Sequence, residues 1–94
     1  MWVYDIETLE FLDVNEAAQK HYGYTEKEFL SMRLQEIRPK EDMPYFQAQL
    51  NLAQKHAFEY MSGVFRHIKK NGEIINVEVQ SNFISYKGRN ARVI

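Results

Sequence analysis

The sequence of 94 residues contains no cysteine, and this absence removes several kinds of chemistry together. Without a thiol the chain forms no disulfide, offers no thiolate nucleophile and builds no cysteine metal site. A chain without disulfides is compatible with a reducing compartment, so we expect a cytoplasmic protein.

The sequence also lacks an excess of charge of either sign and any long apolar run. Its 12 Lys and Arg residues against 13 Asp and Glu residues give a formal net charge of −1. This balance gives no electrostatic reason to expect binding to nucleic acid or to an acidic membrane surface. No apolar run approaches the roughly 20 residues that span a bilayer, and no signal-peptide core is present. We therefore expect no contact of this segment with nucleic acid or membrane.

What the sequence does contain is enough apolar material for one core. Hydrophobic residues make up 45% and aromatic residues 14% of the chain, which is typical of a globular domain. A chain of this length builds a single domain. Because residues 1–4 and 91–94 both have strand-like sequence, we expect one domain over residues 1–94, excised from a longer protein, with its last strand truncated.

The stretch from Val64 to Tyr86 has the clearest local pattern and predicts a long β-hairpin. Asn71-Gly72 is the pair best able to hold two successive residues at positive φ, so it predicts a type I′ turn. After the turn a mostly apolar face alternates with a mostly polar one, which is the period of a half-buried strand. The residues of the apolar face are Ile75, Val77, Val79, Ser81 and Phe83. Because an isolated hairpin is marginally stable in water, the rest of the chain must add strands and a helical cover.

Short strands are predicted at both ends of the chain. Residues 2–6 and 11–14 are rich in β-formers and predict an N-terminal hairpin. Lys87-Gly88 predicts a further turn, after which residues 89–94 begin a fifth strand.

Two short helices are predicted between these strands. Asn15 is a suitable N-cap for a helix over residues 16–22, and Gly23 is a suitable C-terminal glycine. Thr25 and Glu28 have the spacing of a capping box, which predicts the start of the second helix.

A longer helix is predicted from Asp42 to about Ala57. Asp42 is a plausible N-cap, and Pro44 falls in the first turn, where its missing N–H does no harm. An apolar stripe follows at helical spacing, formed by Phe46, Leu50, Ala53 and Ala57. The order of elements predicts an α+β domain, in which an antiparallel sheet has helices packed on one face.

Several stretches of the sequence resemble the PAS family of sensory domains. They are Trp2–Thr8 with Phe11–Ala18, Tyr22–Thr25 with Glu28–Leu30, Ile37–Pro39 with Glu41-Asp42, Lys69–Glu73 and Val77–Val79. The resemblance implies a five-stranded antiparallel sheet in the spatial order 2-1-5-4-3, with the strand from Arg89 in a central position. It also implies a sensory module of a signalling protein, such as a sensor histidine kinase, with a ligand held between the sheet and the longest helix.

The resemblance implies several known classes of ligand, and the cysteine and histidine content of the sequence excludes or disfavours some of them. A flavin-adduct light sensor and a coumaroyl photoreceptor both need a cysteine, so both are excluded in their covalent form. A haem sensor of this family uses a histidine in the early or middle part of the long helix. Residues 45–50 contain none, and His56 falls near the helix end, so haem is not expected. The identity of the cofactor stays unknown.

No catalytic or metal site is predicted. His21, His56 and His67 lie in three different elements, without a partner at metal-ligand spacing. The sequence contains no serine–histidine–acid arrangement on a nucleophile elbow, no phosphate-binding glycine loop and no isolated pair of carboxylates. We therefore do not expect an enzyme, and a small α+β enzyme is the least favoured of three hypotheses.

The candidate ligand pocket is predicted from residues that face the space between helix and sheet. Its apolar members are Tyr22, Phe46, Leu50, Val77, Val79 and Phe83, and its polar members are Gln49, Ser81 and Asn82. If Ser81 points inward, its hydroxyl must find a partner in the backbone or in a ligand. In the alternative, the large side chains fill this space and no ligand binds.

Aromatic residues on the strands predict a second functional surface. Trp2, Tyr4 and Phe65 add apolar area to strands whose helix-facing side already has enough apolar residues. We therefore expect these three aromatic residues on the outer face of the sheet. In PAS modules that face commonly packs on a second copy or on a flanking helix, so the resemblance predicts a homodimer. The first hypothesis is a sensor that binds a small molecule or partner and signals to an effector domain through dimer packing. The second is a ligand-free dimerisation module.

Overall fold

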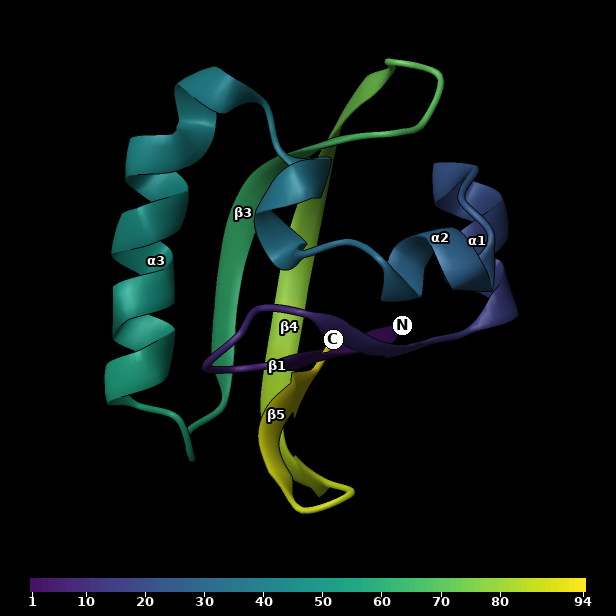
Figure 1. Ribbon diagram of the computed structural model, residues 1–94. Helices are drawn as coiled ribbons and strands as arrows, with labels where there is room; N and C mark the ends of the chain where they lie inside the picture. The colour runs from purple at the N-terminus through teal and green to yellow at the C-terminus, as the bar shows by residue number, and fades with distance from the viewer.

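The computed structural model describes residues 1–94 and contains one five-stranded antiparallel sheet in the order β2-β1-β5-β4-β3 (Figure 1). The strands are β1 (Trp2–Asp5), β2 (Phe11–Val14), β3 (Met61–Ile68), β4 (Ile74–Tyr86) and β5 (Arg89–Val93). The helices are α1 (Glu16–Tyr22), α2 (Glu26–Leu30) and α3 (Met43–Lys55), with 3₁₀ turns η1 (Leu34–Ile37) and η2 (Lys40–Asp42). The predicted α+β class and strand order are confirmed.

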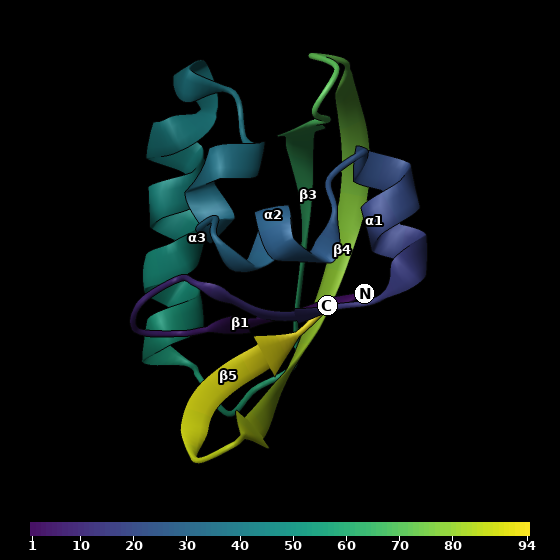
Figure 2. The ribbon, with the colours of Figure 1, turned by 45° about the vertical axis from the view of Figure 1, so that its right-hand side comes forward.

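The last strand closes the sheet from a central position. β5 pairs with β1 on one side and with residues 82–86 of β4 on the other, while residues 74–81 of β4 pair with β3. Backbone hydrogen bonds join Trp2 and Ile94 in both directions, at 3.2 and 2.9 Å. The two ends of the chain therefore lie side by side, as Figures 1 and 2 show.

The first two helices begin and end where local sequence chemistry predicts. The Asn15 side chain accepts a hydrogen bond from the backbone N–H of Ala18 at 2.9 Å, and Gly23 ends α1 with φ +83°. At α2, Thr25 and Glu28 form both hydrogen bonds of the capping box. Each of these contacts is made within a few residues, so each is determined by the local sequence.

The start and end of α3 differ from the prediction. Asp42 makes no capping hydrogen bond, because its two carboxylate oxygens accept from Arg66 at 2.8 and 2.6 Å. The helix ends at Lys55, two residues before Ala57, and the cap residue His56 has a non-helical backbone. A long-range, charge-assisted pair has replaced the expected local cap.

The turn at Asn71-Gly72 is not the predicted type I′ turn. Gly72 has φ +91°, but Asn71 is not among the residues with positive φ. The Gly72 N–H donates to the carbonyl of Lys69, and the Glu73 N–H donates to the Asn71 side chain, both at 2.9 Å. These contacts fit a three-residue hairpin loop, in which an ordinary turn is followed by one left-handed glycine.

The type I′ signature occurs instead at the next turn, between β4 and β5. Lys87 and Gly88 both have positive φ, at +49° and +79°, and they separate the paired residues Tyr86 and Arg89. This tight turn brings β5 back along β4 and into the centre of the sheet.

The hydrophobic core lies between the helices and the inner face of the sheet. Its buried members are Trp2, Tyr4, Phe11, Val14, Ala18, Tyr22, Phe29, Leu34, Ile37, Phe46 and Leu50. On β4 the predicted alternation is confirmed, because Val79 and Ser81 are buried while Glu78, Gln80 and Asn82 are exposed.

The predicted outer-face aromatic surface is wrong. Trp2 and Tyr4 are each only 4% exposed and belong to the core, and Phe65 packs against it. All four residues of β1 are buried, so this strand has no polar–apolar alternation from which its faces could be assigned. No helix of the structure is both long and apolar enough to cross a membrane.

Candidate functional site

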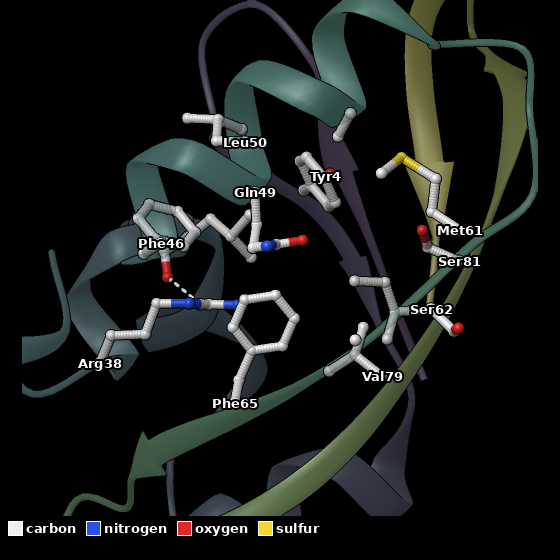
Figure 3. Close-up of a pocket in the computed structure, with 14 residues that line it drawn as sticks. Tyr4, Arg38, Phe46, Gln49, Leu50, Met61, Ser62, Phe65, Val79 and Ser81 are labelled. Carbon is white, nitrogen blue, oxygen red and sulfur yellow. Dashed lines mark hydrogen bonds between the residues drawn. The ribbon is translucent and has the colours of Figure 1, made fainter. Parts of the chain in front are cut away.

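A cavity lies between α3 and the inner face of the sheet (Figure 3). It holds about 50 Å³ of space that water molecules can occupy, and nine of its 14 lining residues are hydrophobic. The lining residues are Tyr4, Leu34, Arg38, Phe46, Gln49, Leu50, Ala53, Met61, Ser62, Gly63, Phe65, Val79, Ser81 and Ile94. A mostly apolar cavity with a few polar groups is the arrangement of small-molecule sites.

Five of the predicted pocket residues line this cavity. They are Phe46, Gln49 and Leu50 from α3, and Val79 and Ser81 from β4. Both sets follow from periodicity, since the helical stripe and the alternating strand face the same space.

Four other predicted pocket residues lie elsewhere. Tyr22 packs against Trp2 and His67, and Val77 lies beside that cluster. Asn82 is exposed, because it alternates with the inward residues on either side of it. Phe83 lies beyond the part of β4 that pairs with β3, where its ring meets Phe58 with centroids 4.6 Å apart.

The most unusual group in the cavity is Arg38, which was not among the predicted pocket residues. It follows η1, is only 6% exposed, and donates from Nη1 to the Leu34 carbonyl at 2.6 Å. Its guanidinium carbon lies 4.3 Å from the ring centre of Phe46 and 5.2 Å from that of Phe65. Burial lowers the pKa of Arg38 to about 10.

A second buried arginine, Arg92 on β5, lies next to the cavity. Its Nε donates to the Ser81 hydroxyl at 3.0 Å, and its Nη1 donates to the Ala57 carbonyl at 2.8 Å. Its Nη2 donates to the carbonyls of Glu59 and Ser81, at 2.6 and 3.0 Å. The partner of the inward Ser81 hydroxyl is therefore the Arg92 side chain, and not the backbone or ligand group that was predicted.

The two buried cations have no acidic partner. No Asp or Glu lines the cavity, and neither Arg38 nor Arg92 takes part in an ion pair. Burial also raises the pKa of Tyr4, so its phenol stays neutral at physiological pH. The cavity is thus positively charged and surrounded by apolar groups.

A second polar cluster lies in the core on the same inner face of the sheet, next to α1. The Tyr22 hydroxyl and His67 Nδ1 are 2.7 Å apart, while His67 Nε2 and Trp2 Nε1 have no hydrogen-bond partner. Burial, and secondarily the charge of Arg38, lowers the pKa of His67 to about 3, and burial raises that of Tyr22 to about 12. A groove of about 330 Å³ runs beside this cluster, between α1 and β4.

The histidines do not come together. His21 is exposed, His56 contacts Glu59 at 3.1 Å beyond the end of α3, and His67 lies on β3. No group of three or more His, Asp or Glu side chains is arranged to hold a metal ion. His56 does not line the cavity, so it is not placed to bind a haem there.

Comparison with known proteins gives a consistent result for the fold. A family model described as "PAS fold" matches residues 11–94. A PAS domain from a two-component sensor histidine kinase is 24% identical with a TM-score of 0.77, and the match covers 97% of this chain and 76% of that chain. A domain of a sensory box sensor histidine kinase/response regulator from Geobacter sulfurreducens is also 24% identical, with a TM-score of 0.73 and the same coverage.

A more distant structural match comes from an animal protein. A variant of the Drosophila melanogaster Cycle PAS-B domain with bound glycerol is 16% identical with a TM-score of 0.80, over 98% of this chain and 93% of that one. No curated protein matches the sequence. At these levels of identity the solved structures establish similarity of fold.

Proposed function

The chain belongs to the PAS family, and from this premise we propose that it is the sensory input module of a signalling protein. A small molecule would bind in the cavity between α3 and the sheet and favour one of two packing arrangements of the domain. An effector domain would receive that change through the packing of a dimer. The observation that carries the proposal is the cavity itself, which the large side chains around it leave open.

The elements around the cavity support a route for such a signal. Gln49 comes from α3, Ser81 from β4, Tyr4 from β1, and Ile94 follows β5. Ile94 is hydrogen bonded to Trp2. A ligand that contacts α3 and these strands together would therefore act on the ends of the chain, where they meet (Figure 2).

The first test asks whether the cavity holds a ligand. Ala53 is buried on α3 and lines the cavity, so Ala53→Leu would fill about the available space, whereas Ala48→Leu adds the same side chain to the exposed face of α3. Native mass spectrometry of the purified wild type should show a retained small molecule, or a compound screen should raise its melting temperature. Ala48→Leu should keep this behaviour and Ala53→Leu should lose it.

Two results would count against ligand sensing. One is a folded wild-type protein that retains no small molecule and responds to no compound. The other is binding that Ala53→Leu leaves unchanged although near-ultraviolet circular dichroism shows that this variant is folded.

The alternative, a ligand-free dimerisation module, is supported by the outer face of the sheet. Val93 and Ile84 lie opposite Asn82 and Ala91 in the β4–β5 pair, on the face away from the cavity, and both are half-buried. We place the dimer contact on this face in place of the aromatic surface that the sequence suggested. Sedimentation at tens of micromolar should give a dimer for wild type and for Leu52→Glu, which changes an exposed apolar residue of α3, and a monomer for Ile84→Glu. A monomeric wild type would exclude this contact.

The remaining parts of the proposal concern the full signalling protein. They are a linked effector domain and a cytoplasmic location. A PAS domain is a sensory rather than a catalytic module, so we assign no reaction to the cavity.

A further inference from the structure

We propose that the ligand of the cavity is a small carboxylate, whose two oxygens are bound by Arg38. This inference rests on the proposed sensory function, because it names the chemical class that the same cavity selects. It starts from the unusual state of the Arg38 side chain.

The guanidinium of Arg38 is buried with most of its hydrogen-bonding capacity unused. An arginine carries five N–H donors, but only Nη1 of Arg38 donates within the protein. Nε is buried without a partner, and Nη2 makes no hydrogen bond. Leaving a buried charged donor without an acceptor is costly, so such a group indicates a partner that is not part of the chain.

The two unused nitrogens lie on one edge of the guanidinium plane. Parallel N–H groups on such an edge match the two oxygens of a carboxylate, which is why arginine binds carboxylates in bidentate fashion. Phe46 and Phe65 contact the guanidinium and limit its rotation. Figure 3 shows the end of the Arg38 side chain directed between these two rings toward the cavity.

No acidic side chain of the protein pairs with Arg38. The arginines Arg66 and Arg89 are paired with acids at the surface, and Lys70 is paired with Glu28. The lining of the cavity contains no acid at all. Arg92 does not compete for the ligand, since Ser81 and three carbonyls already satisfy its three nitrogens.

The cavity also restricts the rest of the ligand. Its volume of about 50 Å³ is well below the roughly 150 Å³ of a cavity that admits benzene. Leu50, Ala53 and Met61 offer only apolar contacts, while the Gln49 amide is directed to the same space (Figure 3). The ligand is therefore a carboxylate with a short apolar chain, of the size of acetate, propionate or butyrate.

The experiment compares a charged and a neutral probe of the same shape. Isothermal titration calorimetry at constant ionic strength measures the binding of propionate and of propionamide to the purified domain. Propionate should bind roughly tenfold or more tightly than propionamide, because hydrogen bonds to a charged group are stronger than neutral ones. Butyrate should bind and benzoate should not. The inference would be overturned if propionate and propionamide bound equally well. It would also be overturned if none of the three carboxylates acetate, propionate and butyrate bound.

Two matched variants test the role of Arg38. Arg38→Gln removes the charge but keeps a polar side chain, and it should weaken propionate binding roughly tenfold or more. Arg33→Gln removes an exposed charge at the other end of η1 and should leave binding unchanged. Propionate binding that Arg38→Gln does not weaken would also overturn the inference. The wild-type probe comparison decides the question alone if Arg38→Gln fails to fold.

The outcome can be separated from that of the sensory proposal. A neutral molecule retained in native mass spectrometry, together with no affinity for the carboxylates, would leave ligand sensing in place and exclude the carboxylate. If nothing binds in either experiment, both fail.

Discussion

The two buried arginines of this domain are held in opposite ways. Arg92 is fully buried, and each of its guanidinium nitrogens donates to an oxygen of Ser81, Ala57 or Glu59. Arg38 is nearly as buried, but it donates to one carbonyl and otherwise contacts aromatic rings. Burial lowers the pKa of both, so both lose hydration on folding.

The difference indicates two roles. The hydrogen bonds of Arg92 attach the segment after α3 to the central strand, so this arginine stabilises the structure. Arg38 lines a cavity and leaves two of its guanidinium nitrogens without a hydrogen bond, so we propose that this arginine is available to a ligand. A buried charge is therefore assigned to structure or to binding by what its donors contact, because burial is similar in the two cases.

The largest expected effect separates these roles directly. Arg92→Met leaves the carbonyls of Ala57 and Glu59 without their donor and should lower the free energy of unfolding by about 3–5 kcal/mol. Arg38→Met loses one hydrogen bond but removes an unpaired buried charge, so it should change stability by about 1 kcal/mol or less. Urea denaturation followed by circular dichroism measures both. Equal losses for the two variants would refute the contrast.

The pH dependence of stability tests the burial of His67, whose pKa is also lowered by the charge of Arg38. With a pKa of about 3 in the folded state and about 6.5 in the unfolded state, His67 takes up a proton on unfolding between these values. Stability should therefore fall as the pH falls below 6.5, by about 2 kcal/mol between pH 8 and pH 5. Most carboxylates titrate below this window.

The control for this prediction replaces the hydrogen-bonded pair as a unit. A double variant with Tyr22→Phe and His67→Phe keeps the ring packing and leaves neither polar partner alone. Its stability should lose most of the slope between pH 6.5 and 5, measured by urea denaturation at each pH. A slope as steep as that of the wild type would show that other groups cause it.

The smallest predicted effect concerns one of the four hydrogen bonds of Arg92. Ser81→Ala removes the hydroxyl that accepts from Nε and should cost about 1 kcal/mol, since the other bonds of Arg92 remain. Ser85→Ala, on the exposed part of β4, should cost less than about 0.5 kcal/mol. Thermal denaturation of both variants measures the difference, and equal melting temperatures would remove Ser81 from the support of Arg92.

The parts of the fold that could be predicted from sequence are those determined by local contacts. Asn15, Gly23 and Thr25 act on residues within four positions, so their chemistry identified the helix ends. The period of β4 likewise identified Val79 and Ser81 as inward residues. The family resemblance supplied the strand order, which the sheet confirms.

The missed features depend on residues far apart in the chain. Asp42 was expected to cap a helix, but Arg66, 24 positions away, takes its carboxylate. The burial of Arg38 requires Phe46 from α3 and Phe65 from β3 to meet over it. The inward direction of Tyr4 could not be predicted either, because β1 is buried on both faces. An arginine in a strand such as β5, with apolar neighbours, is the one signal in the sequence that could have indicated a buried cation.

The central place of β5 has a consequence for how the domain assembles. β5 is the last element of the chain, and yet it must insert between β1, some 85 residues earlier, and β4. The two hairpins can form early, but the sheet is continuous only after a loop of nearly the whole chain has closed. We therefore expect folding to end with the closing of a gap, when β5 joins the part of the sheet that contains β1 to the part that contains β4.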